Sequence, residues 1–294
     1  MNFFSISDIE NLTNIKAHTL RIWEQRYGIC VPKRKESSHR YYDAEDLKEI
    51  LRIAYLYHQG HRISSIAKLN SADIEKLALN NNGMVSSYEH YLNRLLEASI
   101  DLDQSRFESV LTEAIALKGF ENSMAEIVVP FLKKLGMFWL TGHIIPSQEH
   151  FASNIITHKI LAETDRLPRI DKLSSKRKVL LFCPEREFHE IPLLHMNYLL
   201  RKAGSFVIYM GVNTSLESLQ YYCLHHQVDE LYFLLLTNFT KVDQSTYLDQ
   251  LAEKFSTKKI FCSGASLEKL VILPSNVKYL SSGKEILAYA NGLL

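Results

Sequence analysis

The sequence predicts a multidomain protein with three parts: an α-rich winged helix-turn-helix, a four-helix bundle, and an α/β flavodoxin-like (Rossmann-type) domain built on a parallel sheet. Three observations support this fold class. Basic residues cluster on short helical patterns near the start of the chain, four longer amphipathic patterns follow, and apolar runs alternate with helical patterns in the last third. In this chain of 294 residues we expect domain boundaries at 1–75, 84–168 and 176–294.

The overall composition is that of a folded protein of the cell interior. Hydrophobic residues make up 46% of the chain and the formal net charge is +1, so enough apolar surface can be buried to offset the entropy of folding. The longest dense apolar run, 231–236, is too short for a membrane span, and the polar start is unlike a signal or transit peptide. The four cysteines form no CxxC pair, which favours reduced thiols. We therefore expect a cytoplasmic protein without a membrane segment.

Charge is spread unevenly along the chain. Residues 16–40 hold seven basic and two acidic side chains, about +5, so the rest of the chain carries about −4. The basic residues are Lys16, Arg21, Arg26, Lys33, Arg34, Lys35 and Arg40. Clustered Lys and Arg are what contacts to nucleic-acid phosphates require. A solvated basic face is the other interpretation of the charge alone.

The pattern around the basic cluster favours the nucleic-acid interpretation. We expect a helix over 5–14 capped by Ser5 or Ser7, a polar turn, and a second helix over 15–27 that Gly28 ends. Two short helices joined by a tight turn form a helix-turn-helix, whose second helix can enter the major groove. Strands at 31–34 and 39–42 would flank a polar tip as a β-wing, before helices at 44–59, capped by Asp43, and 63–68.

A polar break at 80–83 precedes the middle of the chain, where the apolar spacing is helical. Four amphipathic patterns over about 80 residues predict a small helical bundle, and Pro130 is expected to kink its third helix. After a polar linker at 172–177, strands are expected at 179–183, 206–210, 231–236, 260–262 and 277–280. Helices are expected between them at 190–203, 215–227, 244–256 and 265–270, and after them at 283–292. Such alternation indicates a parallel sheet covered on both faces, which binds ligands beyond the carboxyl ends of its strands.

The N-terminal motif is long and ordered. Residues 19–28 have the sequence Thr-Leu-Arg-Ile-Trp-Glu-Gln-Arg-Tyr-Gly, followed by Pro32, Arg34 and, at 39–42, His-Arg-Tyr-Tyr. This segment resembles the MerR family of bacterial transcription regulators over about residues 3–75. The resemblance implies double-stranded operator DNA as a partner. It places Lys16, Thr19 and Arg21 toward the major groove, and Arg40 and Tyr42 of the wing on phosphates. Ser38 stands where the family usually has the glycine of its wing turn, so the turn is expected to differ locally.

The bundle contains a Trp, nine further residues, and a Glu-His pair: Trp139, Glu149 and His150. Taken singly, these would be a core Trp, a helix-capping Glu and a surface His. Together they resemble the signature of the helical cap that covers cobalamin in corrinoid-binding proteins.

A His in a loop at the carboxyl edge of a parallel sheet can ligate a metal, while a carboxylate two residues earlier holds its other ring nitrogen. Glu187 and His189 have this spacing after the first expected strand, although a lone Glu-x-His also fits a surface His. The segment resembles the Asp-x-His-x-x-Gly motif of cobalamin-binding domains, in which the His is the lower cobalt ligand. The resemblance makes His189 that ligand; Glu187 replaces the Asp, and Pro192 replaces the Gly. It also assigns cofactor binding to Gly211, Thr237 and Gly264, the last preceded by Ser263 where a Gly pair is usual.

Taken together, the three parts resemble the CarH/LitR group of B12-dependent photoreceptor regulators over nearly the whole chain. The resemblance implies adenosylcobalamin between the bundle and the α/β domain, with Trp139, Glu149 and His150 around its upper group. Ligand binding would favour a homo-oligomer, a dimer or a tetramer, that holds DNA as a repressor, and light would reverse this. Leu140 stands where the group can have a second cobalt-capturing His, so a light response here would lack that trap.

Two other functions remain open at this stage. The same architecture could serve a cofactor-independent regulator that answers to a protein partner, which Leu140, Pro192 and Ser263 favour. A corrinoid carrier for methyl transfer would use the same His189, but it has no need of a major-groove helix. No nucleophile and base are spaced for catalysis, so we do not expect an enzyme.

Overall fold

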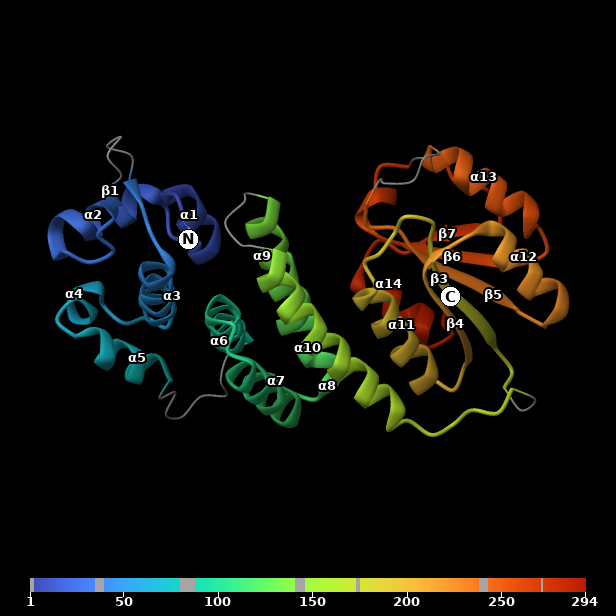
Figure 1. Ribbon diagram of the computed structural model, residues 1–294, viewed down its shortest axis with the longest axis horizontal. Coiled ribbons are helices and arrows are strands. Elements are labelled where there is room, and N and C mark those ends of the chain that lie inside the picture. Colours follow the sequence, from blue (N-terminus) through green and yellow to red (C-terminus); the bar gives the residue numbers. More distant parts are fainter. Residues whose placement is uncertain are drawn as a thin grey trace. The chain divides into compact units, whose positions relative to one another are not determined.

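The N-terminal segment is a helix-turn-helix with a short wing (Figure 1). The computed structural model describes residues 3–34, 40–79, 88–140, 146–172, 175–237, 243–270 and 272–294. Helix α1 (Ile6–Thr13) begins with a capping box between Ser5 and Asp8. After Asn14, in the left-handed conformation, α2 (Ala17–Tyr27) follows and ends at Gly28, with φ of +65°. The predicted order is confirmed, but α2 starts at Ala17 instead of residue 15 because the backbone of Lys16 is still extended.

Strands β1 (Lys33–Arg34) and β2 (Arg40–Tyr41) pair antiparallel, as predicted for the wing. The tip between them, which includes Ser38, lies outside the described residues. Asp43 caps α3 (Ala44–His58) in a second capping box, and α4 (Ile63–Ile66) follows.

Helix α5 (Ser71–Leu79) was not predicted from the sequence, and it runs past the expected boundary at 75. The Asn70 side chain accepts a hydrogen bond from the Asp73 amide at 2.8 Å and so starts the helix. Its buried Ile74 and Ala78 are spaced by one helical turn. A helix of nine residues is short, so the apolar spacing gives only a weak periodic signal, which explains the omission.

The bundle contains the four predicted helical segments: α6 (Tyr88–Asp101), α7 (Gln104–Lys118), a third that runs through α8 (Phe120–Ser123) and α9 (Val129–Leu140), and α10 (Pro146–Asp165). The third segment is disturbed near Pro130, as expected, but by a π-helical turn over Met124–Val128. There the Val129 amide bonds to the Met124 carbonyl five residues back. The wider turn accommodates the missing N–H and the ring of the proline.

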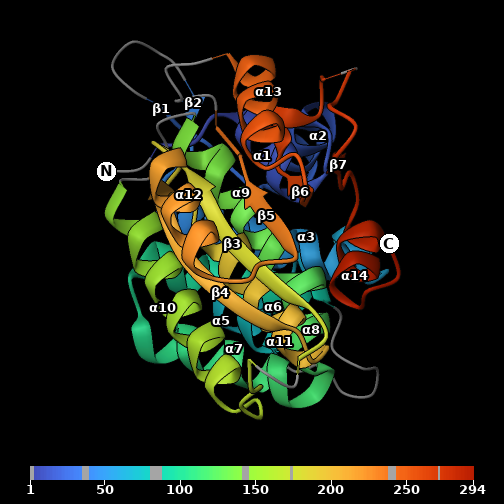
Figure 2. The same cartoon turned by 90° about the vertical axis from the view of Figure 1, so that its right-hand side faces the viewer.

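The C-terminal segment is a five-stranded parallel sheet in the order β4-β3-β5-β6-β7 (Figure 2). Its strands are β3 (Lys178–Pro184), β4 (Phe206–Thr214), β5 (Glu230–Leu234), β6 (Lys259–Ser263) and β7 (Val277–Tyr279). Its helices are α11 (Ile191–Lys202), α12 (Leu216–His225), α13 (Gln244–Lys254) and α14 (Gly283–Ala290). The predicted flavodoxin-like topology is confirmed. The expected helix at 265–270 is only a 3₁₀ turn over Ala265–Leu267.

Apolar side chains cover both faces of this sheet. On one face, Leu219 of α12 and Leu248 and Leu251 of α13 pack on Leu180 and Phe233 of the central strands. Helices α11 and α14 contact each other, and Figure 1 shows them on the opposite side of the sheet. Within the described ranges, every helix is too short or too polar to cross a lipid bilayer.

The described residues form two units by contact, Met1–Ile155 and Ile156–Leu294, with the division inside α10. The winged helix and the first helices of the bundle therefore belong to one packed unit. The three-domain division proposed from the sequence stays a prediction.

Gly264 provides a test of the sheet's carboxyl edge. Its φ is +121°, and a Cβ at this position would lie 2.1 Å from the Leu235 carbonyl oxygen. We expect Gly264→Ala to lower the free energy of unfolding by roughly 2–5 kcal/mol, because it adds backbone strain and a clash with main chain. Urea unfolding measures this.

Gly283→Ala is the matched control, since no atom lies within 4 Å of its added Cβ and it sits in the first turn of α14. It should leave stability unchanged or slightly raised. Equal stability of the two variants would contradict the role given to Gly264.

Candidate functional site

The loop after β3 holds a buried carboxylate beside an exposed imidazole. The Glu187 side chain is fully buried, whereas 53% of the His189 side chain is exposed. The Oε1 atom of Glu187 accepts from His189 Nδ1 at 2.6 Å and from the His189 amide at 3.0 Å. The carboxylate expected to hold the second ring nitrogen of His189 is therefore bonded to it directly.

The other oxygen of Glu187 is held by the loop after β5. Its Oε2 accepts from the Leu236 and Thr237 amides, both at 2.8 Å, and from Thr237 Oγ1 at 3.1 Å. Thr237 was predicted as a cofactor-binding residue; in the structure it positions Glu187. The Leu236 amide could not be found from sequence, because any residue type supplies it.

These donors determine the charge of Glu187. Burial alone raises its pKa, but the hydrogen bonds from His189 and the Thr237 amide outweigh burial and lower the pKa to about 2. Glu187 is therefore an anion at neutral pH, and Nδ1 of His189 is the donor. In a neutral imidazole this places the lone pair on Nε2, the form that ligates a metal.

Backbone geometry brings the neighbouring strand ends to the same edge. Gly264 lets the main chain after β6 approach Leu235, whose amide donates to the Ser263 carbonyl at 3.0 Å. This contact holds the start of the loop that donates to Glu187. Gly211, with φ of +79°, lies in the irregular part of β4, and a Cβ there would lie 4.0 Å from the Glu190 carboxylate.

Two further contacts at this edge were not predicted. Asn213 has a φ of +55°; its side chain accepts from the Arg186 amide at 2.9 Å and its amide donates to the Glu187 carbonyl at 3.2 Å. Tyr209 donates to Glu190 at 3.0 Å. An Asn two residues after a Gly is the only sequence signal for the first contact. Pro192 lies in the first turn of α11, where a proline is well tolerated.

The chemistry of the donor set limits which metal the site could hold. Among the residues that the structure describes, no three His, Cys, Asp or Glu side chains cluster as a ligand set for a free metal ion. A single His oriented by a carboxylate instead fits a metal that brings its other ligands with it, as in a macrocycle. The residues present therefore fit a corrinoid cobalt better than a zinc ion, which needs three or four protein ligands.

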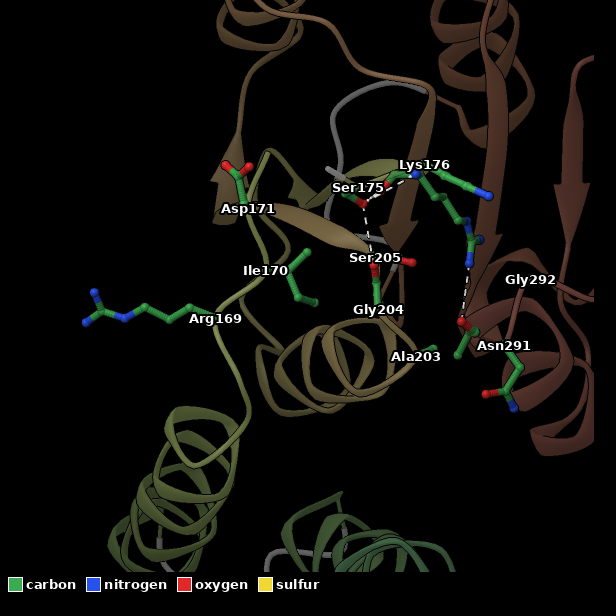
Figure 3. Close-up of a pocket in the computed structure, with 12 residues that line it drawn as sticks. Arg169, Ile170, Asp171, Ser175, Lys176, Ala203, Gly204, Ser205, Asn291 and Gly292 are labelled. Atoms are coloured by element: carbon green, nitrogen blue, oxygen red, sulfur yellow. Dashed lines mark hydrogen bonds between the residues drawn. The ribbon is translucent and has the colours of Figure 1, made fainter. Parts of the chain in front are cut away.

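A separate hollow of about 670 Å³ lies at the amino ends of the strands, beside the start of β3 and the ends of α11 and α14. Figure 3 shows Arg169 extending away from it. The Arg177 guanidinium there is already engaged by Glu230 at 2.8 Å and by the Tyr289 carbonyl at 2.9 Å. The hollow is distinct from the His189 loop, which lies at the carboxyl ends of the strands.

The predicted cap residues lie on α9 and α10. Trp139 is in the last turn of α9, and its side chain lies outside the described part, as do Gly142 and His143. Glu149 accepts from Ser153 Oγ at 2.5 Å, and His150 is largely exposed with its Nε2 3.6 Å from Glu149. Glu149 and His150 are thus adjacent in the first turns of α10.

Most of the residues predicted to bind DNA are accessible on the winged helix. Lys16 is exposed and pairs with Glu10 at 2.9 Å, and Arg21 is exposed on α2. Thr19 is half-buried, with its hydroxyl 3.3 Å from His18 Nε2, and Arg40 of the wing lies 3.7 Å from Glu24. These placements agree with a solvent-facing basic surface on α2 and β2.

Tyr42 corrects one part of the DNA prediction. It is 2% exposed, and its backbone bridges to Phe4 through two 2.8 Å hydrogen bonds. A side chain closed off from solvent cannot reach a phosphate without leaving the core. The sequence could not show that the last residue of the wing turns inward, because strand alternation gives no preferred face in so short a ladder.

Two segments match known protein families. Residues 4–73 match the MerR HTH family regulatory protein model, and residues 91–162 match the B12 binding domain model. The first match spans the winged helix and the second spans the bundle. The chain therefore carries a MerR-type helix-turn-helix joined to a B12-binding-domain segment.

Two relatives are similar to this chain over most of its length. The HTH-type transcriptional repressor CarH of Myxococcus xanthus is 28% identical over 222 residues, 74% of this chain and 73% of that protein. The repressor CarA of the same organism is 26% identical over 227 residues, 76% of this chain and 73% of that protein. A monomethylamine corrinoid protein of Methanosarcina barkeri aligns with a TM-score of 0.54 and 15% identity, over 71% of this chain and all of that chain, which shows a similar fold.

The charge of Glu187 makes a stability prediction. A pKa lowered from 4.5 to about 2 stabilises the folded state while the carboxyl is ionised. The contribution, roughly 3 kcal/mol, is fully present above pH 4.5 and is lost as the pH falls toward 2. We expect Glu187→Gln to be destabilised by about this amount at neutral pH, with a smaller difference from wild type in acid.

Urea unfolding at several pH values measures this difference. The exposed neighbour Glu185, changed to Gln, is the control and should behave like wild type. A Glu187→Gln deficit that stays constant from neutral pH to pH 3 would contradict the ionised buried carboxylate.

Proposed function

We propose that this chain, which joins a MerR-type helix-turn-helix to a B12 binding domain, is a transcription regulator whose binding to operator DNA is controlled by cobalamin. The observation that carries the proposal is the Glu187–His189 pair at the sheet's carboxyl edge, in a chain that also presents an exposed basic helix. The CarH and CarA relatives, both named as repressors, favour a repressor.

On the DNA side, α2 enters the major groove with Lys16, Thr19 and Arg21, while Arg40 of the wing contacts phosphate. In the absence of DNA, Lys16 and Arg40 pair with Glu10 and Glu24 on the surface. Exchange of such exposed pairs for phosphate contacts costs little, because exposed ion pairs are worth about 0–1 kcal/mol.

On the cofactor side, cobalamin supplies a cobalt already held by four corrin nitrogens. His189 would hold the cobalt through Nε2, and Glu187 would orient the imidazole by accepting a hydrogen bond from Nδ1–H. Gly211, Thr237 and Gly264 shape the edge around this pair. The adenosyl form, with Trp139, Glu149 and His150 around its upper group, follows from the resemblance of those residues to corrinoid caps.

The finer parts of the proposal concern assembly and light. A homo-oligomer, a dimer or a tetramer, would hold the operator in the cytoplasm without catalytic turnover, and loss of the adenosyl group would release it. Because Leu140 follows Trp139, this chain lacks the second cobalt-capturing His at that position. The light response would therefore end without a cobalt ligated by two histidines.

A cofactor-independent regulator is the second candidate, because Pro192 stands at the motif's Gly position. A corrinoid methyl carrier is disfavoured, since the MerR-type segment over residues 4–73 has no role in methyl transfer.

Cobalamin binding is tested with purified protein and adenosylcobalamin in the dark. Wild type should bind the cofactor, and His189→Ala should bind it more weakly, because the ligand supplied by the protein is lost. Glu187→Gln should bind about 10–100-fold more weakly because its imidazole is no longer oriented. His225→Ala, an exposed His on α12, is the control.

An affinity of His189→Ala equal to that of wild type would remove His189 as the ligand. No binding by wild type would leave the cofactor-independent regulator as the better account.

Operator binding is tested by titrating a palindromic promoter fragment at several salt concentrations. Arg21→Ala should weaken binding by about 1–3 kcal/mol, since a groove contact is lost, and wild-type affinity should fall steeply with salt. Arg169→Ala, which removes an equal charge from the C-terminal unit, should bind like wild type. Equal weakening by both variants would indicate a general charge effect and contradict recognition by α2.

A further inference from the structure

The last turn of α1 is held by a residue 122 positions away. Lys134 Nζ of α9 donates to the Leu12 carbonyl at 2.9 Å. The last four carbonyls of a helix have no partner within the helix, and α1 carries no basic residue in its own last turn. Lys134 therefore supplies the cation that this helix end favours.

The surroundings of Lys134 make this contact specific. Its side chain is half-buried, and burial lowers its pKa. A desolvated ammonium needs its acceptors, so loss of the Leu12 carbonyl would leave a charge poorly solvated.

A buried ion cluster makes a second connection between the winged helix and the bundle. Glu97 of α6, only 5% exposed, accepts from Arg52 of α3 at 2.8 Å and from Arg106 of α7 at 2.6 Å. Removal of one partner from such a cluster leaves an uncompensated charge, which is strongly destabilising. The contact between α3 and α6 is therefore difficult to open.

Two helices connect this region to the residues assigned to the upper face of the cofactor: α9, which carries both Lys134 and Trp139, and α10, which carries Glu149 and His150. Lys134 precedes Trp139 by five residues on α9. Gln148, directly before Glu149 and His150, donates to the Ile100 carbonyl of α6 at 3.0 Å. Gln148 also lines one small void together with Phe4 and Leu47 of the winged helix.

We propose that these contacts form a rigid joint that transmits the cofactor state from the cap residues to the recognition helix. The joint consists of Lys134 with the Leu12 carbonyl, and Glu97 with Arg52 and Arg106. A shift of α9 moves α1 directly through Lys134, and α2 follows because Glu10 of α1 also accepts from the Ala17 amide at 2.9 Å. The inference rests on the proposed function and gives it a route of regulation.

The test compares Lys134→Met with Lys133→Met. Both remove one charge from the same helix, but Lys133 is exposed and lies outside the joint. Operator Kd is measured with and without adenosylcobalamin in the dark, and cofactor affinity is measured separately by absorbance. We expect the cofactor to change the operator Kd of wild type and Lys133→Met by about tenfold or more. In Lys134→Met this factor should shrink at least about threefold, with cofactor affinity in the absence of DNA unchanged.

A second readout needs no ligand. Hydrogen exchange over 6–15 should be faster in Lys134→Met than in Lys133→Met, because α1 loses its C-terminal cation. Should Lys134→Met fail to fold, Arg106→Gln carries the same expectation for the coupling factor.

The outcomes distinguish failure of the joint from failure of the proposed function. If cobalamin changes the operator Kd of wild type and of Lys134→Met by the same factor, the joint is overturned and the proposed function stands. A wild type whose operator affinity ignores cobalamin would contradict the proposed function and the inference with it.

Discussion

The hydrogen-bonded carboxylate of Glu187 is the interaction on which the candidate site depends. A fully buried anion persists only because the loops after β3 and β5 direct donors at both of its oxygens. The same bonds that stabilise the charge set the tautomer of His189 and hold its ring at the sheet edge. The stability of the loops and the orientation of His189 therefore depend on the same hydrogen bonds. A loop arrangement without donors to Glu187 would not hold the His189 ring in this orientation either.

Hydrogen bonds and ion pairs also connect the winged helix to the bundle. The winged helix has its own small core, around Leu20, Trp23 and Leu47, but two of its polar groups find their partners in the bundle. The carbonyl of Leu12 is satisfied by Lys134, and Arg52 is neutralised by Glu97. The segment that matches the MerR family model is thus structurally dependent on the segment that matches a B12 binding domain.

The fold could be predicted well from the sequence where periodicity was long. The parallel sheet follows from buried apolar runs, and the helix-turn-helix from caps such as Ser5 and Gly28. Helix α5 was missed because only Ile74 and Ala78 are buried among those of its side chains that the structure describes. The helix around Pro130 contains a π turn that no residue pattern predicts.

The candidate site could be predicted only in part. Glu187 and His189 carry chemistry in their side chains and could be identified from their spacing. The amides of Leu236 and Thr237 could not, because main-chain donors have no sequence signature. Tyr42 was misplaced for a related reason, since its orientation is set by pairing with Phe4, 38 positions earlier in the chain.

Ligation of a bound cobalt by His189 can be measured by electron paramagnetic resonance. Protein labelled with ¹⁵N only in histidine is loaded with cob(II)alamin. A histidine ligand predicts that the triplet splitting from an axial ¹⁴N becomes a doublet, and that His189→Ala loses the doublet. A triplet that survives labelling would show that the ligand is the cofactor's own base and would contradict the account.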